Sequence, residues 1–223
     1  MLGYCSQPRE IRAADEAPRL DKQIRDDFMA GLRGDQAALE RASAAAAKIL
    51  EAQPRHAEAM VWLGAATLKL SGDAFQKEGD QQKGTELWKK GNGQMDKAVE
   101  LEPDNIAVRV TRGSTLLVVT RSPVPPEWQQ ELLSKAVADF THVIELHKDQ
   151  FGKLPEHSRG ELLAALADGY DRLGEKEKSR AELERIVREL PGTEYAKRAG
   201  AWMDNPAYPV EQRTCVGCHQ AAK

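Results

Sequence analysis

Cysteine is scarce in this chain, and its distribution is uneven. The 223 residues contain three cysteines, and two of them, Cys215 and Cys218, lie among the last nine residues. Long apolar runs are also missing. The longest, STLLVVT at 114–120, falls far short of the roughly 20 residues that cross a bilayer, so we expect no membrane span. The net charge of -3 gives no basic surface of the kind that nucleic-acid binding requires.

Catalytic motifs are missing as well. There is no H-E-x-x-H and no glycine-rich phosphate loop, and the carboxylates are spread along the predicted helices. We therefore predict a non-enzymatic protein. Four histidines lie at or near predicted helix ends and are interpreted as solvated: His56, His142, His147 and His157. Four tryptophans are interpreted as packing residues between helices: Trp62, Trp88, Trp128 and Trp202.

Amphipathic helices dominate what is present, and strict strand alternation is absent. The clearest unit spans 161–192. Apolar residues recur at helical spacing up to Leu173, Gly174 breaks the helix, and a second apolar helix ends at Pro191. The spacing predicts that Tyr170 is buried between these two helices.

Three earlier segments follow the same plan, with helix pairs over 20–54, 57–103 and 105–149. An insertion after residue 72 is predicted to lengthen the second helix of its pair, and a final helix over 193–205 is predicted to cap the array. This divides the chain into an N-terminal segment 1–19 predicted to be flexible, a helical domain 20–205 and a tail 206–223. Pro206 and Pro209 predict an extended tail.

The 161–192 unit resembles the tetratricopeptide repeat (TPR), a helix-turn-helix of about 34 residues. Ala167, Tyr170, the Leu173-Gly174 pair and Pro191 match the family pattern, whereas Ser179 replaces the usual alanine. The resemblance implies an all-α, right-handed α-solenoid of about four hairpins that acts as a scaffold for a protein or peptide partner. The concave groove expected from it is lined by Val61, Ala65, Val110, Ser114, Leu117, Ala164, Asp168 and Asp171.

Two further inferences concern charge on this surface. The Lys/Asn clamp that some family members use to hold a C-terminal carboxylate is not evident, so we expect no chaperone-docking role. Arg109 and Arg112 would form either a local positive spot or part of a solvated helix face, and the second interpretation is preferred.

The tail contains C-x-x-C-H, which resembles the attachment motif of c-type haem. The resemblance implies that Cys215 and Cys218 form thioether bonds to haem and that His219 is an axial ligand of the iron. The candidates for the sixth ligand are Met203, Tyr208 and His157. Haem needs an apolar pocket, which the tail alone does not supply, so we expect any haem to be exposed or to lie against the last helices near Trp202 and Tyr195.

Other interpretations of the tail remain open. Cys215, Cys218 and His219 would hold zinc only with a fourth ligand, and none is evident nearby. A thiol–disulfide pair or an inert tail are the remaining alternatives. Haem attachment implies a periplasmic or other extracytoplasmic location, although no signal peptide is visible at the start of the sequence. The functions kept open are a TPR scaffold with haem on its tail, a small electron-transfer haem protein positioned by the repeats, and a cytoplasmic adaptor with incidental cysteines.

Overall fold

The computed structural model describes residues 20–122, 124–205 and 207–214. Over these ranges the protein is all helical and contains no strand, as the sequence predicts. The helices are α1 (Leu20–Leu32), α2 (Gln36–Ala52), α3 (Ala57–Asp73), α4 (Gln81–Leu101), α5 (Ile106–Val119), α6 (Pro126–Leu146), α7 (Glu156–Arg172), α8 (Lys176–Glu189) and α9 (Glu194–Asp204). A π-helical turn, η1 (Ala74–Glu78), follows α3, and two 3-10 turns are η2 (Phe151–Lys153) and η3 (Val210–Gln212).

Local sequence signals set the ends of these helices. The side chains of Asp35, Asn105 and Thr193 cap α2, α5 and α9 by accepting hydrogen bonds from backbone N–H groups three residues on. Pro126 occupies the first position of α6, where its missing N–H costs nothing. Gly174 lies between α7 and α8 with a φ of 82°, a left-handed conformation that favours glycine.

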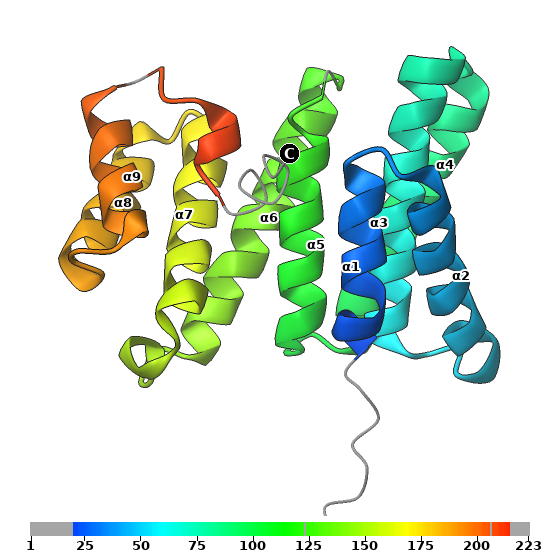
Figure 1. Ribbon diagram of the computed structural model, residues 1–223, viewed down its shortest axis with the longest axis horizontal. Coiled ribbons are helices and arrows are strands. Elements are labelled where there is room, and N and C mark those ends of the chain that lie inside the picture. The colour runs from blue at the N-terminus through cyan, green and yellow to red at the C-terminus, as the bar shows by residue number, and fades with distance from the viewer. Residues whose placement is uncertain (1–19, 123, 206, 215–223) are drawn as a thin grey trace, which may run out of the picture.

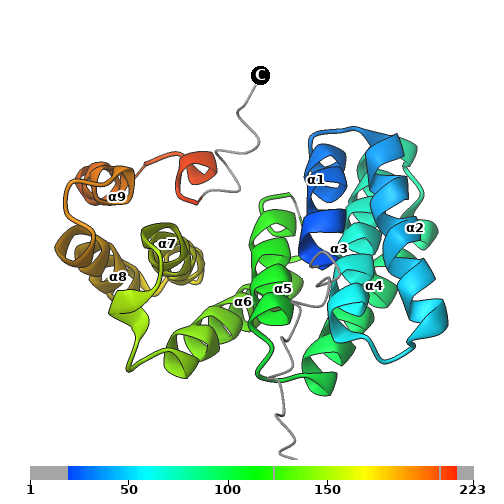
Figure 2. The ribbon, with the colours of Figure 1, turned by 60° about the horizontal axis from the view of Figure 1, so that its bottom comes forward.

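The helices pack in sequence order. The most extensive contacts join α1 with α2, α3 with α4, α5 with α6 and α7 with α8, and α9 packs on α8. Figure 1 shows the helices side by side in a row that runs from α2 and α4 at one end to α8 and α9 at the other. In Figure 2, α1, α5 and α7 lie toward one side of the row and α6 toward the other. Helix α5 packs more closely on α3 than on α7.

Aromatic pairs join neighbouring helices. The Trp62 and Phe28 rings form a T-shaped pair at a centroid distance of 5.2 Å, which connects α3 with α1. Trp88 of α4 stacks on Trp128 of α6 at 5.0 Å. Trp202 of α9 is buried. The interpretation of the four tryptophans as packing residues is therefore confirmed.

The structure differs from the sequence-based expectations at three places. The insertion after residue 72 lengthens α4 as predicted, but it also adds η1 to the end of α3. Tyr170 is only half-buried, because its ring lies at the surface beneath the Lys178 ammonium group, 5.3 Å from the ring centroid. The part of the tail that the structure describes is not simply extended, since residues 210–212 form η3 and Arg213 and Thr214 are buried.

Over the described part of the chain, none of the helices combines the length and the apolar character needed to span a bilayer.

Candidate functional site

An apolar groove of about 290 Å³ lies between α5 and α7, which we call the α5–α7 groove. One face of α5 forms its first wall, because Ile106, Val110, Ser114 and Leu117 follow one another at spacings of three or four residues. Helix α6 lies between the two walls in Figure 1. The complete lining is Ile106, Val110, Ser114, Leu117, Val118, Phe140, Val143, His147, Leu154, His157, Ser158, Glu161, Leu162, Ala165 and Thr214.

Only part of the expected concave groove lines this cavity. Val110, Ser114 and Leu117 lie in its α5 wall. Val61 and Ala65 have no exposed surface, because α3 is enclosed by its neighbours. Ala164 is also buried, and it points toward α8 and α9, where it contacts the same small space as Leu183 and Trp202. These three residues offer a partner almost no surface.

Asp168 and Asp171 belong to an ion cluster, which we call the Asp168 cluster; it consists of Arg121, Asp168, Asp171, Arg172 and Arg213. Asp168 is fully buried, and its carboxylate lies 3.4 Å from both Arg172 and Arg213 and 3.7 Å from Arg121. Asp171 pairs with Arg213 at 2.9 Å. Burial lowers the pKa of Arg172, and the neighbouring Arg121 and Arg213 act in the same direction, against the attraction of Asp168. Both carboxylates are therefore paired with arginine side chains, Asp168 without exposed surface and Asp171 close to the surface.

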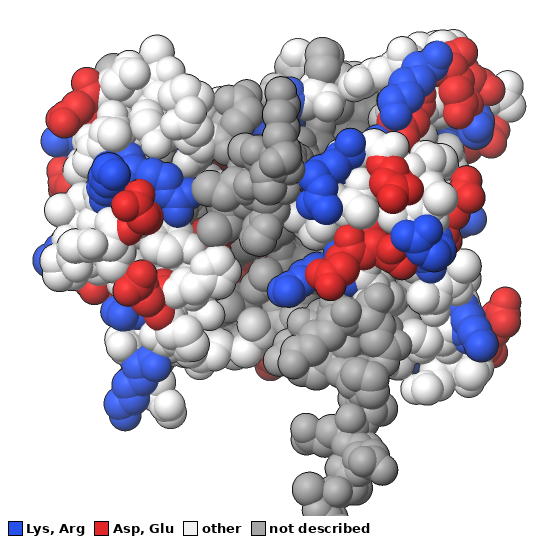
Figure 3. Space-filling model, in the orientation of Figure 1, with Lys and Arg blue, Asp and Glu red and all other residues white. Residues whose placement is uncertain are grey.

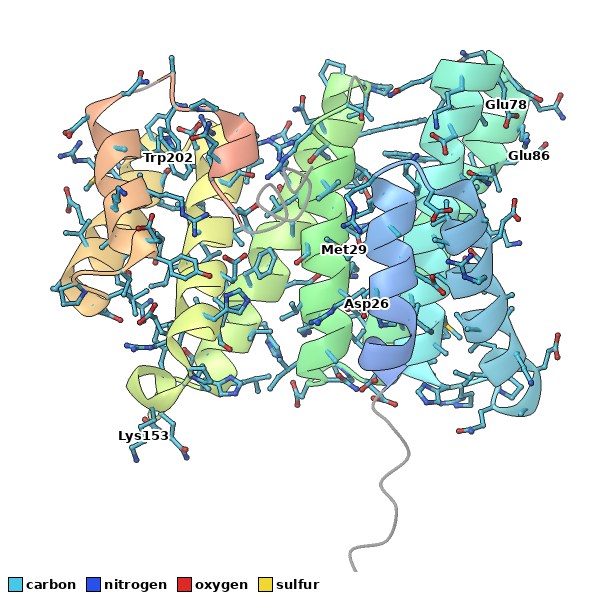
Figure 4. The ribbon with its side chains drawn as sticks, in the orientation of Figure 1. Asp26, Met29, Glu78, Glu86, Lys153 and Trp202 are labelled. Atoms are coloured by element: carbon cyan, nitrogen blue, oxygen red, sulfur yellow. The ribbon has the colours of Figure 1, made fainter. Side chains whose placement is uncertain are left out.

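The Asp168 cluster fixes the last described residues at one end of the α5–α7 groove. Arg213 donates hydrogen bonds to Asp171 and to the Tyr208 carbonyl oxygen, and its guanidinium lies over the Trp202 ring at 4.3 Å. Trp202 is labelled in Figure 4, on the side of α9 that faces residues 207–214. Thr214 is buried, accepts a hydrogen bond from Arg121 at 3.0 Å and lines the groove.

Two histidines line the α5–α7 groove: His147 is half-buried, which corrects its interpretation as solvated, whereas His157 is exposed, as expected. His147 donates from Nδ1 to the Val143 carbonyl oxygen at 2.9 Å, because a carbonyl can only accept, and this leaves Nε2 as the unprotonated nitrogen of the neutral ring. His157 Nδ1 hydrogen-bonds the Tyr195 hydroxyl at 2.7 Å. The other two histidines act structurally: His56 caps α3, and His142 lies 2.7 Å from Asp104.

Arg109 and Arg112 do not form a solvated face, and this interpretation was wrong. Both guanidinium groups bind the fully buried carboxylate of Asp139 on α6. Arg112 binds it through two hydrogen bonds of 2.7 Å and also contacts Asp96 of α4 at 2.9 Å. The network therefore joins α4, α5 and α6. On the face shown in Figure 3, positive and negative side chains are interspersed.

The haem hypothesis stays a prediction. Cys215, Cys218 and His219 lie outside the described residues. Of the three candidates for a sixth ligand, His157 lines the α5–α7 groove, whereas Tyr208 stacks on Trp202 at 6.4 Å and Met203 packs against the core from α9. Within the described ranges, no three His, Cys, Asp or Glu side chains are grouped so as to hold a metal ion.

The chain matches no protein-family model, no curated protein and no solved structure in the comparisons made with it. Its functional assignment therefore depends on the residues and geometry above.

Proposed function

We propose that this protein is a non-enzymatic interaction scaffold of the TPR type, whose α5–α7 groove binds an apolar peptide segment. Under this proposal the successive helix pairs form a right-handed α-solenoid and α9 caps its end. The order of packing supports it, as do the Leu173-Gly174 turn with its left-handed glycine and the close approach of α3 and α4 at Gly64 and Gly91.

The observation that carries the proposal is the apolar groove between α5 and α7. In the TPR family the first helix of each pair faces the ligand, and α5 and α7 are both first helices of their pairs. Val110, Ser114 and Leu117 were expected at a partner surface from the sequence alone, and all three line the groove. The lining favours a ligand with apolar side chains, since few charged groups face the cavity.

Selection of peptides from a random library on the full-length protein tests this proposal. We expect selected peptides to be rich in apolar residues and to bind Val110→Asp at least about tenfold more weakly, or about 1.4 kcal/mol, because a carboxylate in the groove wall must be desolvated. Val187→Asp is the matched control, since Val187 is an exposed apolar residue on α8 and does not line the groove. Equal affinity for Val110→Asp and the unaltered protein would rule the groove out as the binding site.

A second candidate function is a small electron-transfer protein that carries haem on Cys215, Cys218 and His219. The specific observation in its favour is that Thr214, the residue before Cys215, lines the α5–α7 groove. The described residues fit such a group, because the groove supplies two histidines and the apolar surface that the tail itself lacks. When bound, a c-type haem supplies a one-electron redox centre. This function implies an extracytoplasmic location.

Expression with a signal peptide in a host that matures c-type cytochromes tests the second candidate. The protein should retain its Soret band after acid-acetone extraction, because thioether bonds are covalent. The double variant Cys215→Ser, Cys218→Ser should lose that band and keep its helical circular dichroism. If the protein binds zinc stoichiometrically and no haem, Cys215, Cys218 and His219 form a metal site and not a haem-attachment site. If the tail binds neither haem nor zinc, only the proposal of an interaction scaffold remains.

A further inference from the structure

The chain direction at residue 214 is fixed by buried contacts. Arg213 is held by Asp168, Asp171 and the Tyr208 carbonyl oxygen, and only 6% of its side chain is exposed. Thr214 is held by Arg121. The described part of the chain therefore ends in the lining of the α5–α7 groove.

The groove is long enough to accommodate the residues that follow. Its α5 wall extends from Leu117 to Ile106, which corresponds to about 17 Å along a helix with a rise of roughly 1.5 Å per residue. An extended chain covers at most about 3.3–3.6 Å per residue, so residues 215–219 span up to about 17 Å. The segment that contains C-x-x-C-H can thus extend along the whole wall.

The chemistry of the segment also suits the groove. Residues 215–223 are CVGCHQAAK, which contains small apolar residues and no carboxylate side chain. At the Thr214 end, Nε and Nη1 of Arg121 are buried and meet no hydrogen-bond acceptor in the part of the chain that the structure describes. A buried donor without an acceptor is costly, and a chain that continues from Thr214 brings backbone carbonyl groups that can act as acceptors.

We propose that residues 215–219 enter the α5–α7 groove, so that the first ligand of the groove is the protein's own C-x-x-C-H segment. Cys215, Cys218 and His219, with any group that they carry, are then covered by the apolar walls. A partner peptide must displace this segment, which makes the tail a competitive regulator of the groove. The inference rests on the proposed function to the extent that both assign a peptide ligand to this groove.

Thiol reactivity tests where the segment lies. The full-length, haem-free and fully reduced protein, with Cys5→Ser in the background, is reacted with a maleimide. We expect Cys215 and Cys218 to react at least about tenfold more slowly than in a synthetic peptide of residues 213–223, since buried thiols are inaccessible to the reagent. Ser114→Trp, which fills the groove from α5, should restore the peptide rate. Val187→Trp on the exposed face of α8 is the control and should leave the thiols protected.

Two outcomes would overturn the inference. In the first, Cys215 and Cys218 of the unaltered protein react with maleimide as fast as in the peptide. In the second, the thiols are protected in the unaltered protein and remain protected in Ser114→Trp. Circular dichroism of both tryptophan variants verifies that they are folded. A second measurement separates this inference from the proposed function. Val216→Asp, which places a charge on the tail, should tighten binding of a library-selected peptide by several-fold. Protected thiols together with failure to select any peptide would refute the partner scaffold and support the tail as ligand.

Discussion

Gly64 and Gly91 bring α3 and α4 into backbone contact. A Cβ atom on Gly91 would lie 2.8 Å from the Gly64 carbonyl oxygen and 2.9 Å from Leu68 Cγ, both closer than real Cβ atoms approach their neighbours. A Cβ on Gly64 would lie 2.7 Å from Met95 Cγ. Neither glycine has a positive φ, so both are required by space and not by backbone conformation.

We expect Gly91→Ala to lower the free energy of unfolding by about 1–3 kcal/mol, because the added methyl group forces the two helices apart. Gly93→Ala is the matched control on the same helix, where no heavy atom lies within 4 Å of the added Cβ. It should raise stability by about 0.5–1 kcal/mol, since glycine inside a helix is entropically unfavourable. Urea denaturation measures both changes, and shifts of the same sign would contradict the close approach.

Glu182 is a second single residue whose contribution to stability can be tested, in this case through its dependence on pH. Burial raises the pKa of Glu182, and the Arg185 guanidinium 3.8 Å away only partly opposes this. A carboxyl group with a folded-state pKa above its unfolded value costs stability when it is ionised, and the cost fades as the pH falls through the folded pKa.

Glu182→Gln should therefore raise the free energy of unfolding at neutral pH, and the gain should shrink toward zero as the pH is lowered below the folded pKa. Glu184→Gln, an exposed neighbour on α8, should change stability little at either pH. Urea midpoints across this range measure both variants. A gain from Glu182→Gln that grows on acidification would refute the raised pKa.

At the scale of helices, buried ion pairs determine how α5 and α6 pack. Asp139 of α6 has no exposed surface and binds two arginines of α5. Two charged groups removed from water are favourable together only when their geometry is good, and each alone is strongly unfavourable. The contact between the two helices therefore depends on all members of the network.

We predict that Asp139→Ala destabilises the protein by about 3–5 kcal/mol, because it leaves the Arg112 guanidinium buried without its main partner. The double variant Asp139→Leu, Arg112→Met should recover most of the loss, since neither charge is then buried. Chemical denaturation of the single and double variants measures the coupling. Additive losses in the double variant would show that the two residues do not act as a pair.

The sequence predicted the helices well and their buried charges poorly. Caps, prolines and apolar spacing are local signals, and the ends predicted for the first helix pair (20–54) and for the final helix (193–205) lie within two residues of those observed. Asp139, Asp168 and Arg112 were not recognised as buried, because an isolated charge on a helix is usually solvated and its partners lie on other helices. The place of His147 and His157 in the groove lining was missed for the same reason, because the groove forms only when helices far apart in sequence pack together.

At the scale of the whole molecule, the α5–α7 groove and the C-terminal segment meet at Thr214. The groove is formed by residues of α5, α6 and α7 and by the turn before α7. At one end of the groove, the Asp168 cluster holds Arg213 and Thr214 in place. His157 is the candidate sixth ligand that lines this groove, and its ring is oriented by the Tyr195 hydroxyl. A hydrogen bond at one ring nitrogen commonly orients the other nitrogen toward a metal.

If haem is attached to Cys215 and Cys218, we expect His157→Ala to convert a low-spin ferric spectrum into a high-spin one, because Nε2 of His157 no longer fills the sixth position. Added imidazole should restore the low-spin spectrum. Met203→Leu and Tyr208→Phe are controls that should leave the spectrum unchanged, since Tyr208 stacks on Trp202 and neither residue lines the groove. His147→Ala is the competing test, because His147 also lines the groove and only its Nδ1 hydrogen-bonds the Val143 carbonyl oxygen. A spin change in His147→Ala without one in His157→Ala would assign the sixth position to His147 and refute His157.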